Sequence, residues 1–278
     1  MTGEIVPIGV GQCGINMLRS HHESMLREHA IGHDGQPLNK SSISYVDDRQ
    51  GISTYFDENI KGGYMFRGAM IDLDRSSIDS VKNSTWARMC NPDSLIGSSS
   101  SSGNLWATGH YTEGAEMIGN IIDQIRLQAE TTDRLDGFFL MSSLGGGTGS
   151  RLGTLLGNKI LEEYSSRVMC TFSNLSPNAD DNLLAPYNNL LGYTRFIDCS
   201  TIAALFDNNS MQDILFRSNP TLRYTYQDLN RISQEAISDM TASTRFPGPM
   251  RSSLRKLPRI WFHSIYYISY LCRMQVSA

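Results

Sequence analysis

A glycine-rich segment near the middle of the chain has the residue types that bind phosphate. It reads Leu-Gly-Gly-Gly-Thr-Gly-Ser (144–150), follows an apolar run at 135–141, and precedes leucines and isoleucines spaced along one helix face. A strand, a glycine loop and a helix in this order place backbone N–H groups around phosphate oxygens, with the positive end of the helix dipole facing the charge. Thr148 and Ser150 add hydroxyls. The segment lacks the lysine of a P-loop and the glycine order of a Rossmann loop, so these residues alone leave open a turn that binds no ligand.

Two more segments place polar groups at the ends of predicted strands. Gly-Gln-Cys-Gly (11–14) separates an alternating strand pattern from a helix that extends to about Arg27, and it is a second candidate phosphate contact. Residues 70–74 predict a strand with Asp72 and Asp74 at its carboxyl end, which is where open α/β sheets bind ligands. Solvated loop carboxylates are the plainer alternative for these two residues.

The remaining periodicity predicts strands that alternate with helices. Strand patterns recur at 167–172 and 201–206, and Thr225 begins a long helix in which Asp228 completes a pair typical of a capping box. Pro7 removes a hydrogen-bond donor from the first strand, which argues against a central position for that strand. The alternation predicts an α/β fold with a doubly wound, mostly parallel sheet.

Composition narrows the class of protein. The chain has 278 residues with 40% apolar and 19% charged residues, and its formal net charge of -4 gives no basic footprint for nucleic acid. Five scattered cysteines without a C-x-x-C pair indicate reduced thiols. The six histidines have no metal-site spacing, and we expect them at the surface. The most apolar late segment, 260–272, is too short to span a bilayer, so we expect a cytoplasmic protein with no membrane or nucleic-acid partner.

Short motifs spread along the chain occur together in the order of one known family. They are Gly-Gln-Cys-Gly (11–14), Gly-His-Tyr-Thr-Glu-Gly-Ala-Glu (109–116), Ser-Leu-Gly-Gly-Gly-Thr-Gly-Ser (143–150), Pro-Tyr-Asn (186–188), Asp-Asn (207–208), Thr-Tyr-Gln-Asp-Leu-Asn (225–230) and Arg-Phe-Pro-Gly (245–248). On these motifs the chain resembles tubulins, and most closely β-tubulin, up to about residue 257. The glycine loop is shared by the tubulin and FtsZ superfamily, whereas the motif at 109–116 is specific to tubulins.

The resemblance implies a fold, a ligand and partners. It implies a tubulin/FtsZ-type GTP-binding domain at 1–224, a core helix at 225–244, and at 245–278 the start of a second domain with a divergent tail. The ligands implied are GTP or GDP with Mg²⁺, and the partners are an α-tubulin-like subunit and other tubulins, packed head to tail in the microtubule cytoskeleton. The residues that the resemblance assigns to the nucleotide are Gln12, Cys13, Gly103, Asn104, Ser143, Gly146, Gly147, Thr148, Gly149, Asp181, Asn208, Tyr226 and Asn230.

In this assignment each group has a role that suits its chemistry. Asp181 faces the ribose, Asn208 and Asn230 read the guanine edge with an amide donor and acceptor, and Tyr226 stacks on the base. Asp74 falls where the family has a glutamate associated with magnesium, and a shorter carboxylate can still serve a Mg²⁺ that keeps several waters. Taken singly, each side chain has an ordinary structural alternative. Their joint presence in family order favours ligand binding.

Two departures from the family bear on chemistry. Arg151 follows the glycine loop where the family has a small residue, and it is expected to reach a phosphate, to crowd the loop or, by default, to lie exposed. In tubulins the loop after the long helix reaches the γ-phosphate of the next subunit, but here it carries Arg251, Ser253 and Lys256 and no acid. We therefore assign no catalytic residue, and we expect GTP hydrolysis only if a neighbouring subunit supplies the acid.

Past Leu257 the likeness gives way to an aromatic-rich stretch, and we expect no counterpart of the second domain of β-tubulin. We therefore expect an apolar face of the long helix to be exposed. The favoured function is a structural constituent of the microtubule cytoskeleton. The alternatives are a truncated, non-polymerising tubulin paralogue that acts as a regulator or dead-end binder or has no function, and a nicotinamide-dependent dehydrogenase, which the missing G-x-G-x-x-G disfavours.

Overall fold

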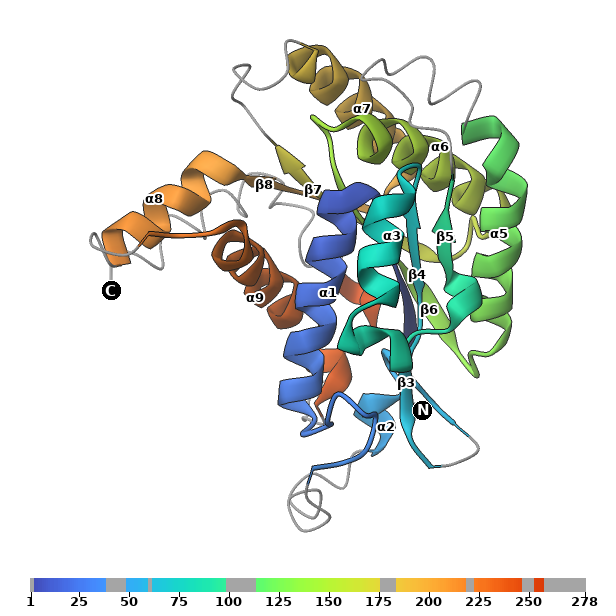
Figure 1. Ribbon diagram of the computed structural model, residues 1–278. Helices are drawn as coiled ribbons and strands as arrows, with labels where there is room; N and C mark the ends of the chain where they lie inside the picture. Colours follow the sequence, from blue (N-terminus) through green and yellow to red (C-terminus); the bar gives the residue numbers. More distant parts are fainter. Residues whose placement is uncertain are drawn as a thin grey trace.

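The computed structural model describes residues 3–38, 49–59, 62–98, 114–175, 184–218, 223–246 and 253–257. Its centre is a six-stranded parallel sheet in the order β5-β4-β1-β6-β7-β8 (Figure 1). The strands of this sheet are β1 (Glu4–Val10), β4 (Ala69–Asp72), β5 (Leu95–Gly97), β6 (Leu135–Ser143), β7 (Val168–Leu175) and β8 (Ile202–Asp207). A separate antiparallel ribbon pairs β2 (Phe56–Glu58) with β3 (Tyr64–Phe66).

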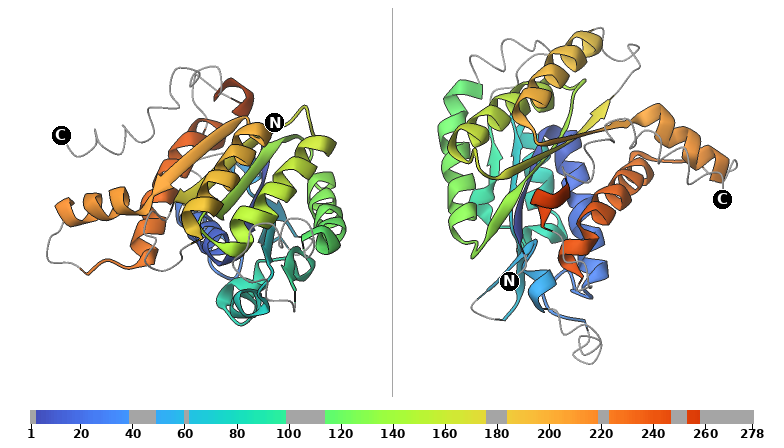
Figure 2. Two further views of the ribbon diagram at one scale, coloured as in Figure 1. Left: turned by 90° about the horizontal axis from the view of Figure 1, so that it is seen from above. Right: turned by 180° about the vertical axis from the view of Figure 1, so that it is seen from behind.

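Helices cover both faces of the sheet, which confirms the predicted doubly wound α/β fold (Figure 2). The face with Ile5 and Phe139 packs against α1 (Gly11–Glu28), α3 (Arg75–Lys82), α8 (Asn208–Ser218) and α9 (Tyr226–Arg245). The opposite face packs against α5 (Gly114–Glu130), α6 (Gly147–Glu163) and α7 (Ala185–Cys199). The short elements are α2 (Arg49–Ile52) and the 3-10 turns Thr85–Arg88, Pro92–Ser94 and Leu254–Lys256.

The first strand occupies a central position, so the expectation drawn from Pro7 is wrong. Strand β1 lies between β4 and β6, and Pro7 is in register with Phe139 of β6. The Pro7 carbonyl faces Gly68, one residue before β4 begins at Ala69. The backbone nitrogen and carbonyl of one strand residue point to the same side, so the Pro7 nitrogen also faces Gly68 and not β6. The N–H that proline lacks therefore costs no hydrogen bond between β1 and β6.

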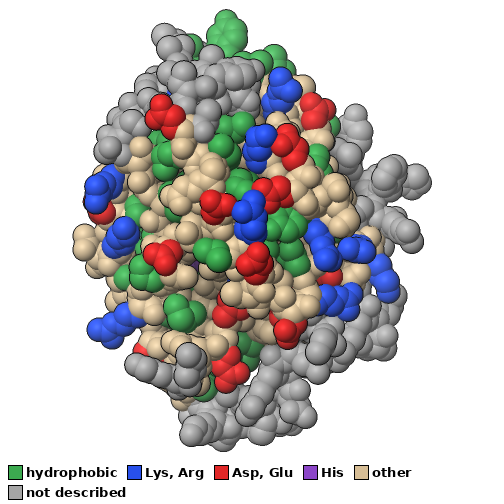
Figure 3. Space-filling model, turned by 90° about the vertical axis from the view of Figure 1, so that its right-hand side faces the viewer, with side chains coloured by type: hydrophobic (Ala, Val, Ile, Leu, Met, Phe, Trp, Pro, Cys, Tyr) green, Lys and Arg blue, Asp and Glu red, His purple; other side chains and the backbone are tan. Residues whose placement is uncertain are grey.

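Charged side chains are interspersed on the outer surface around α5 (Figure 3). Arg126 of α5 bridges Asp123 on its own helix, at 2.7 Å, and Glu163 at the end of α6, at 2.9 Å. Beneath this polar surface Ile121 and Ile125 are fully buried against the sheet. Among the described helices, none is both long and apolar enough to cross a membrane.

Helix α9 lies beside α1 and presents a polar outer surface. Its start has the predicted capping box: the Thr225 side chain accepts from the backbone of Asp228, whose carboxylate accepts from the Thr225 amide at 2.7 Å. Arg231, Glu235 and Asp239 are exposed at four-residue spacing, and the apolar residues of the helix face the sheet. The expected exposed apolar face is therefore absent from the described part of α9.

Helix α1 buries two histidines, so the expectation that the histidines lie at the surface is wrong. His21 Nδ1 lies 2.8 Å from Gln234 Oε1 of α9, and the His22 ring stacks on Phe66 with ring centroids 3.9 Å apart. Both side chains are almost inaccessible to solvent. Adjacent residues face different sides of a helix, but α1 is covered on two sides, by α9 and by the residues around β3. Both sides are therefore interior.

Candidate functional site

The two glycine turns of the sequence meet at the carboxyl edge of the sheet. Gly11 has a positive φ of 75°, and a Cβ on it would lie 3.1 Å from the Gly149 nitrogen. A Cβ on Gly149 would in turn lie 2.7 Å from the carbonyl oxygen of Ser143. Only glycine combines these close approaches with the left-handed turn at residue 11. The start of α1 is thereby brought against the start of α6.

Both helices begin without a side-chain cap. Val10 precedes α1 and Gly146 precedes α6, neither supplies a capping hydrogen bond, and neither first turn contains an acidic residue. The free N–H groups and the positive dipole ends of both helices therefore favour an anion. The two first turns border one cavity of about 300 Å³. Its lining residues are Val10, Gly11, Gln12, Cys13, Asp72, Asp74, Ser77, Ser143, Gly146, Gly147, Thr148 and Gly149.

Two carboxylates from the end of β4 face the same cavity. Asp72 is buried, and burial raises the pKa of its carboxyl group, although hydrogen bonds from the Asp74 amide, Ser77 and Thr148 oppose the rise. Asp74 is exposed and caps α3: its carboxylate accepts from the Ser76 amide at 2.9 Å, which lowers the pKa of Asp74. The predicted site contains Asp74 without Asp72. The structure brings both carboxylates together with the glycine loop.

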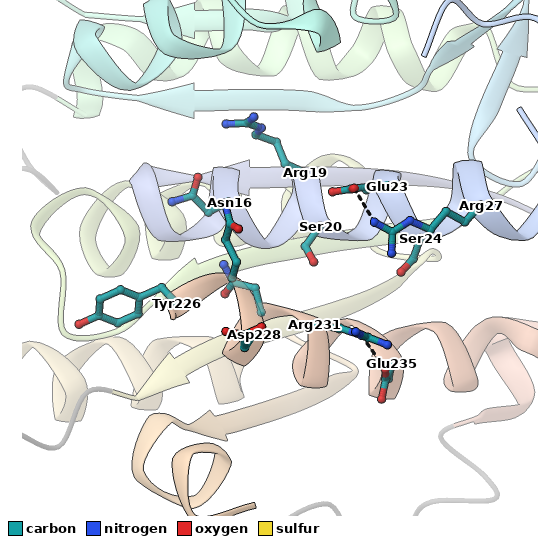
Figure 4. Close-up of a pocket in the computed structure, with 12 residues that line it drawn as sticks. Asn16, Arg19, Ser20, Glu23, Ser24, Arg27, Tyr226, Asp228, Arg231 and Glu235 are labelled. Atoms are coloured by element: carbon teal, nitrogen blue, oxygen red, sulfur yellow. Dashed lines mark hydrogen bonds and ion pairs between the residues drawn. The ribbon is translucent and has the colours of Figure 1, made fainter. Parts of the chain in front are cut away.

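A second hollow of about 630 Å³ lies between α1 and α9. Tyr226 and Asn230, at the start of α9, line it together with Asn16 of α1, and Figure 4 shows Asn16 and Tyr226 near the same end. Two ion pairs line the other end, Glu23 with Arg27 at 2.6 Å on α1 and Arg231 with Glu235 at 3.3 Å on α9. Asn16 is absent from the predicted site, although it follows Gln12 by four residues and so shares its helix face.

Asn208 begins α8 and lines neither of these two hollows. Its Oδ1 atom is buried and has no hydrogen-bond partner among the described residues. Buried amide oxygens in proteins nearly always accept a hydrogen bond. The unpaired Oδ1 of Asn208 is therefore available to accept a hydrogen bond from a ligand. Of the other predicted site residues, Gly103, Asn104 and Asp181 lie outside the described residues.

Cys13 and Asn174 form a further pair beside the cavity. Asn174, at the end of β7, is 4% exposed and donates from its amide nitrogen to the Cys13 sulfur at 3.5 Å. Burial raises the pKa of the Cys13 thiol, and the hydrogen bond from Asn174 partly opposes the rise. Cys13 therefore stays a neutral thiol at neutral pH and acts as a contact, not as a nucleophile. Asn174 was not among the predicted site residues.

Arg151 does not lie exposed, contrary to the default expectation. The residue stands in the second turn of α6, and its side chain is fully buried. Helix α6 is covered there by α7, where a Cβ on Gly192 would lie 3.4 Å from the Ser150 Cβ, and by the sheet on its other side. Arg151 is also not among the residues that line the cavity.

The matched family model agrees with this geometry. The family described as "Tubulin/FtsZ family, GTPase domain" matches residues 4–216, which include both glycine turns, Asp72 and Asp74. This chain belongs to the tubulin/FtsZ family.

Curated tubulins match the chain over most of its length. It is 41% identical over 255 residues to the tubulin beta-6 chain of Gallus gallus, an alignment that covers 91% of this chain and 56% of the relative. It is 38% identical over 278 residues to the tubulin beta-1 chain of Chondrus crispus and 38% identical over 272 residues to the tubulin beta chain of Saccharomyces cerevisiae. These alignments cover 95% of this chain in each case, and 60% and 59% of the relatives. The chain thus spans less than two thirds of the tubulins it matches.

Proposed function

We propose that this chain binds a guanine nucleotide at the carboxyl edge of its sheet. The observation that carries the proposal is the convergence of two uncapped helix starts, α1 and α6, on one cavity across Gly11 and Gly149. A triphosphate supplies the anionic oxygens that such N–H groups need. Thr148 and Ser143 add hydroxyl groups, and Gln12 adds an amide. Membership of a family whose matched domain is described as a GTPase domain favours a guanine nucleotide over other anions.

The base would occupy the adjoining hollow between α1 and α9. Tyr226 is 74% exposed there and offers an aromatic face for stacking, while Asn230 and Asn16 offer amide groups to the edge of a purine. The unpaired oxygen of Asn208 is suited to accept from the guanine amino group. Phosphates near the glycine loop and a base near Tyr226 would lie along the first turns of α1, joined by the ribose.

A magnesium ion would accompany the phosphates. Asp72 and Asp74 supply carboxylate oxygens at the mouth of the cavity, and Thr148 shares a hydrogen bond with Asp72. The described residues contain no group of three or more His, Cys, Asp or Glu side chains placed to hold a metal. Two carboxylates suit Mg²⁺, which commonly takes its other ligands from phosphate and water. When bound, the ion would neutralise charge between the phosphates.

This chain would bind GTP more readily than it hydrolyses GTP. Gln12 and Thr148 can hold the phosphates, and the two carboxylates that line the cavity, Asp72 and Asp74, are assigned to Mg²⁺ and not to an attacking water. We propose that a tubulin-type subunit, such as α-tubulin, packs head to tail on this edge and supplies that group in the cytoplasmic microtubule cytoskeleton. Phosphate release by the chain alone is expected to be slow and to rise when the partner is added. A rate that the partner leaves unchanged would contradict this part of the proposal.

The nucleotide proposal is tested by calorimetric titration with GTP, ATP and NAD in the presence of Mg²⁺. GTP is expected to bind, and ATP and NAD are not. Tyr226→Ala is expected to weaken GTP binding by about 5- to 150-fold, because stacking on an aromatic side chain contributes about 1–3 kcal/mol. Tyr187→Ala is the matched control, since Tyr187 of α7 is 69% exposed and lies on the other face of the sheet. Equal effects of the two substitutions would contradict the base-binding role of Tyr226.

Co-sedimentation with assembled α/β-tubulin tests the partner. Incorporation in proportion to the amount added supports a subunit of the polymer. Inhibition of assembly at low ratios of this chain to tubulin supports the alternative of a dead-end binder. Such a protein would have the same nucleotide site but would not enter the polymer. The absence of any effect on assembly would contradict both.

A further inference from the structure

A polar side chain ends an apolar row on β7. Cys170, Phe172 and Asn174 share the face of the strand that α1 covers, because side chains alternate along a strand. Cys170 and Phe172 are fully buried in the core, and Asn174, at the carboxyl end, is 4% exposed. An amide in this position must find hydrogen-bond partners in the protein or in a ligand.

The protein supplies hydrogen-bond partners for only some of the polar atoms of the Asn174 side chain. Its nitrogen donates to the Cys13 sulfur at 3.5 Å, which is a weak acceptor. Its backbone carbonyl accepts from the Leu144 amide at 3.0 Å and from the Ser143 hydroxyl at 3.4 Å. The side-chain oxygen Oδ1 is buried and has no hydrogen-bond partner among the described residues. Asn174 is not among the residues that line the two hollows, but its contact Cys13 lines the cavity, so a ligand bound there could supply the donor that Oδ1 lacks.

The point at which Asn174 contacts α1 indicates which part of a bound nucleotide would lie beside Asn174. Cys13, its contact on α1, lines the cavity of the glycine loop. Asn16, about one turn further along α1, lines the hollow that contains Tyr226. Asn174 therefore contacts α1 between the two regions, beside Cys13. In a nucleoside triphosphate the ribose joins the phosphates to the base. The ribose hydroxyls are therefore the hydrogen-bond donors that would lie between the two regions.

We infer that Oδ1 of Asn174 accepts a hydrogen bond from a ribose hydroxyl of the bound nucleotide and makes the site discriminate against deoxynucleotides. The inference rests on the proposed nucleotide function. Asn174 is then a specificity-determining residue. The same side chain holds Cys13, and its backbone holds the start of the glycine loop, so ribose recognition is tied to the geometry of the phosphate cavity.

The experiment compares the affinities of GTP, 2′-deoxy-GTP and 3′-deoxy-GTP for four proteins. The unaltered chain is expected to bind GTP about 5- to 150-fold more tightly than one of the deoxy analogues, the range for one lost hydrogen bond that leaves a buried acceptor unpaired. Asn174→Val, close in volume and suited to a strand, should reduce this ratio to about one. Asn174→Asp keeps the acceptor and should preserve the ratio, although added negative charge near the phosphates lowers both affinities. Asn120→Ala, at an exposed position of α5, is the control and should leave every affinity unchanged.

The outcomes separate this inference from the proposed function. Equal affinity of the unaltered chain for all three nucleotides, or an unchanged ratio in Asn174→Val, overturns the inference and leaves the nucleotide proposal standing. The absence of GTP binding by the unaltered chain overturns both. If Asn174→Val binds neither nucleotide, the ratio in Asn174→Asp decides: preservation supports the acceptor role and loss refutes it.

Discussion

Acid should destabilise this protein through the histidines that α1 buries. His21 lies against Gln234 of α9 and the Tyr55 ring, and His22 stacks on Phe66. Burial lowers the pKa of His21 to about 3 and that of His22 well below its usual value. Both side chains are therefore neutral in the folded chain across the physiological range. Unfolding exposes them to water, where their pKa returns to about 6.5.

The sign and size of the effect follow from linkage between protonation and folding. Below about pH 6.5 the unfolded chain gains protons that the folded chain does not, so stability falls as pH falls. Between about pH 7.5 and about pH 5.5 each such histidine removes about 1.4 kcal/mol. Burial also lowers the pKa of His29 to about 4, and the three histidines together should remove about 4 kcal/mol. Burial raises the pKa of Glu4 and Asp72, which acts in the opposite direction at lower pH.

A substitution isolates the histidine contribution from these opposing groups. His22→Phe keeps an aromatic ring on Phe66 and removes the titrating group, so the loss of stability between the two pH values should shrink by about 1.4 kcal/mol. Urea unfolding followed by circular dichroism, without nucleotide, measures the loss at each pH. His33→Gln is the control because that side chain is exposed in the folded chain. A loss in His22→Phe equal to that of the unaltered chain would refute the reasoning.

Three further substitutions test contacts that form the fold and the site, each read out by urea unfolding. Thr225→Ala removes half of the capping box shared with Asp228 and should cost about 0.5–2 kcal/mol; no change would mean that the box does not stabilise α9. Arg245→Met breaks the ion pair with Glu28 that joins α9 to α1, and it should cost about 1–3 kcal/mol, because Arg245 is 1% exposed and the Ser238 carbonyl, to which it donates at 2.8 Å, would lose this donor. A cost below about 1 kcal/mol would place this pair with ordinary surface pairs. Gly149→Ala should cost about 1–3 kcal/mol and abolish GTP binding, because the new Cβ would meet backbone; normal binding would show that the two helix starts need not approach so closely.

Elements with strong local signals were predictable from the sequence. The capping box at Thr225 and Asp228 marks the start of α9 within one residue, because cap chemistry is local. The apolar run at 135–141 likewise marks β6, which continues to Ser143. Strand β5 (Leu95–Gly97) was not predicted, since a three-residue edge strand exists only through its pairing with β4. The division of the chain into domains at 224 and 244 stays a prediction.

Site residues that belong to a local sequence motif could be predicted. Residues whose role depends on contact between distant segments could not. The glycine loop and Asp74 could be assigned from their place in the sequence, and the cavity brings them together. The buried positions of His21 and Arg151 depend on which helices pack above them, and helix spacing alone does not encode this. Asn174 reads as an ordinary strand-end residue until its contact with Cys13, 161 positions away in the sequence, is known.

The most direct test of the central claim is a competition for the cavity at the two helix starts. The purified chain is incubated with Mg²⁺ and an equimolar mixture of GTP, ATP, CTP and UTP and then desalted, and the retained nucleotide is released by acid and quantified by chromatography. We predict about one nucleotide per chain, because one cavity joins the uncapped starts of α1 and α6. We predict guanine over the other three bases because Asn16 and Asn230 offer its edge both donors and acceptors. Retention of no nucleotide, or of all four in equal amounts, would contradict the account.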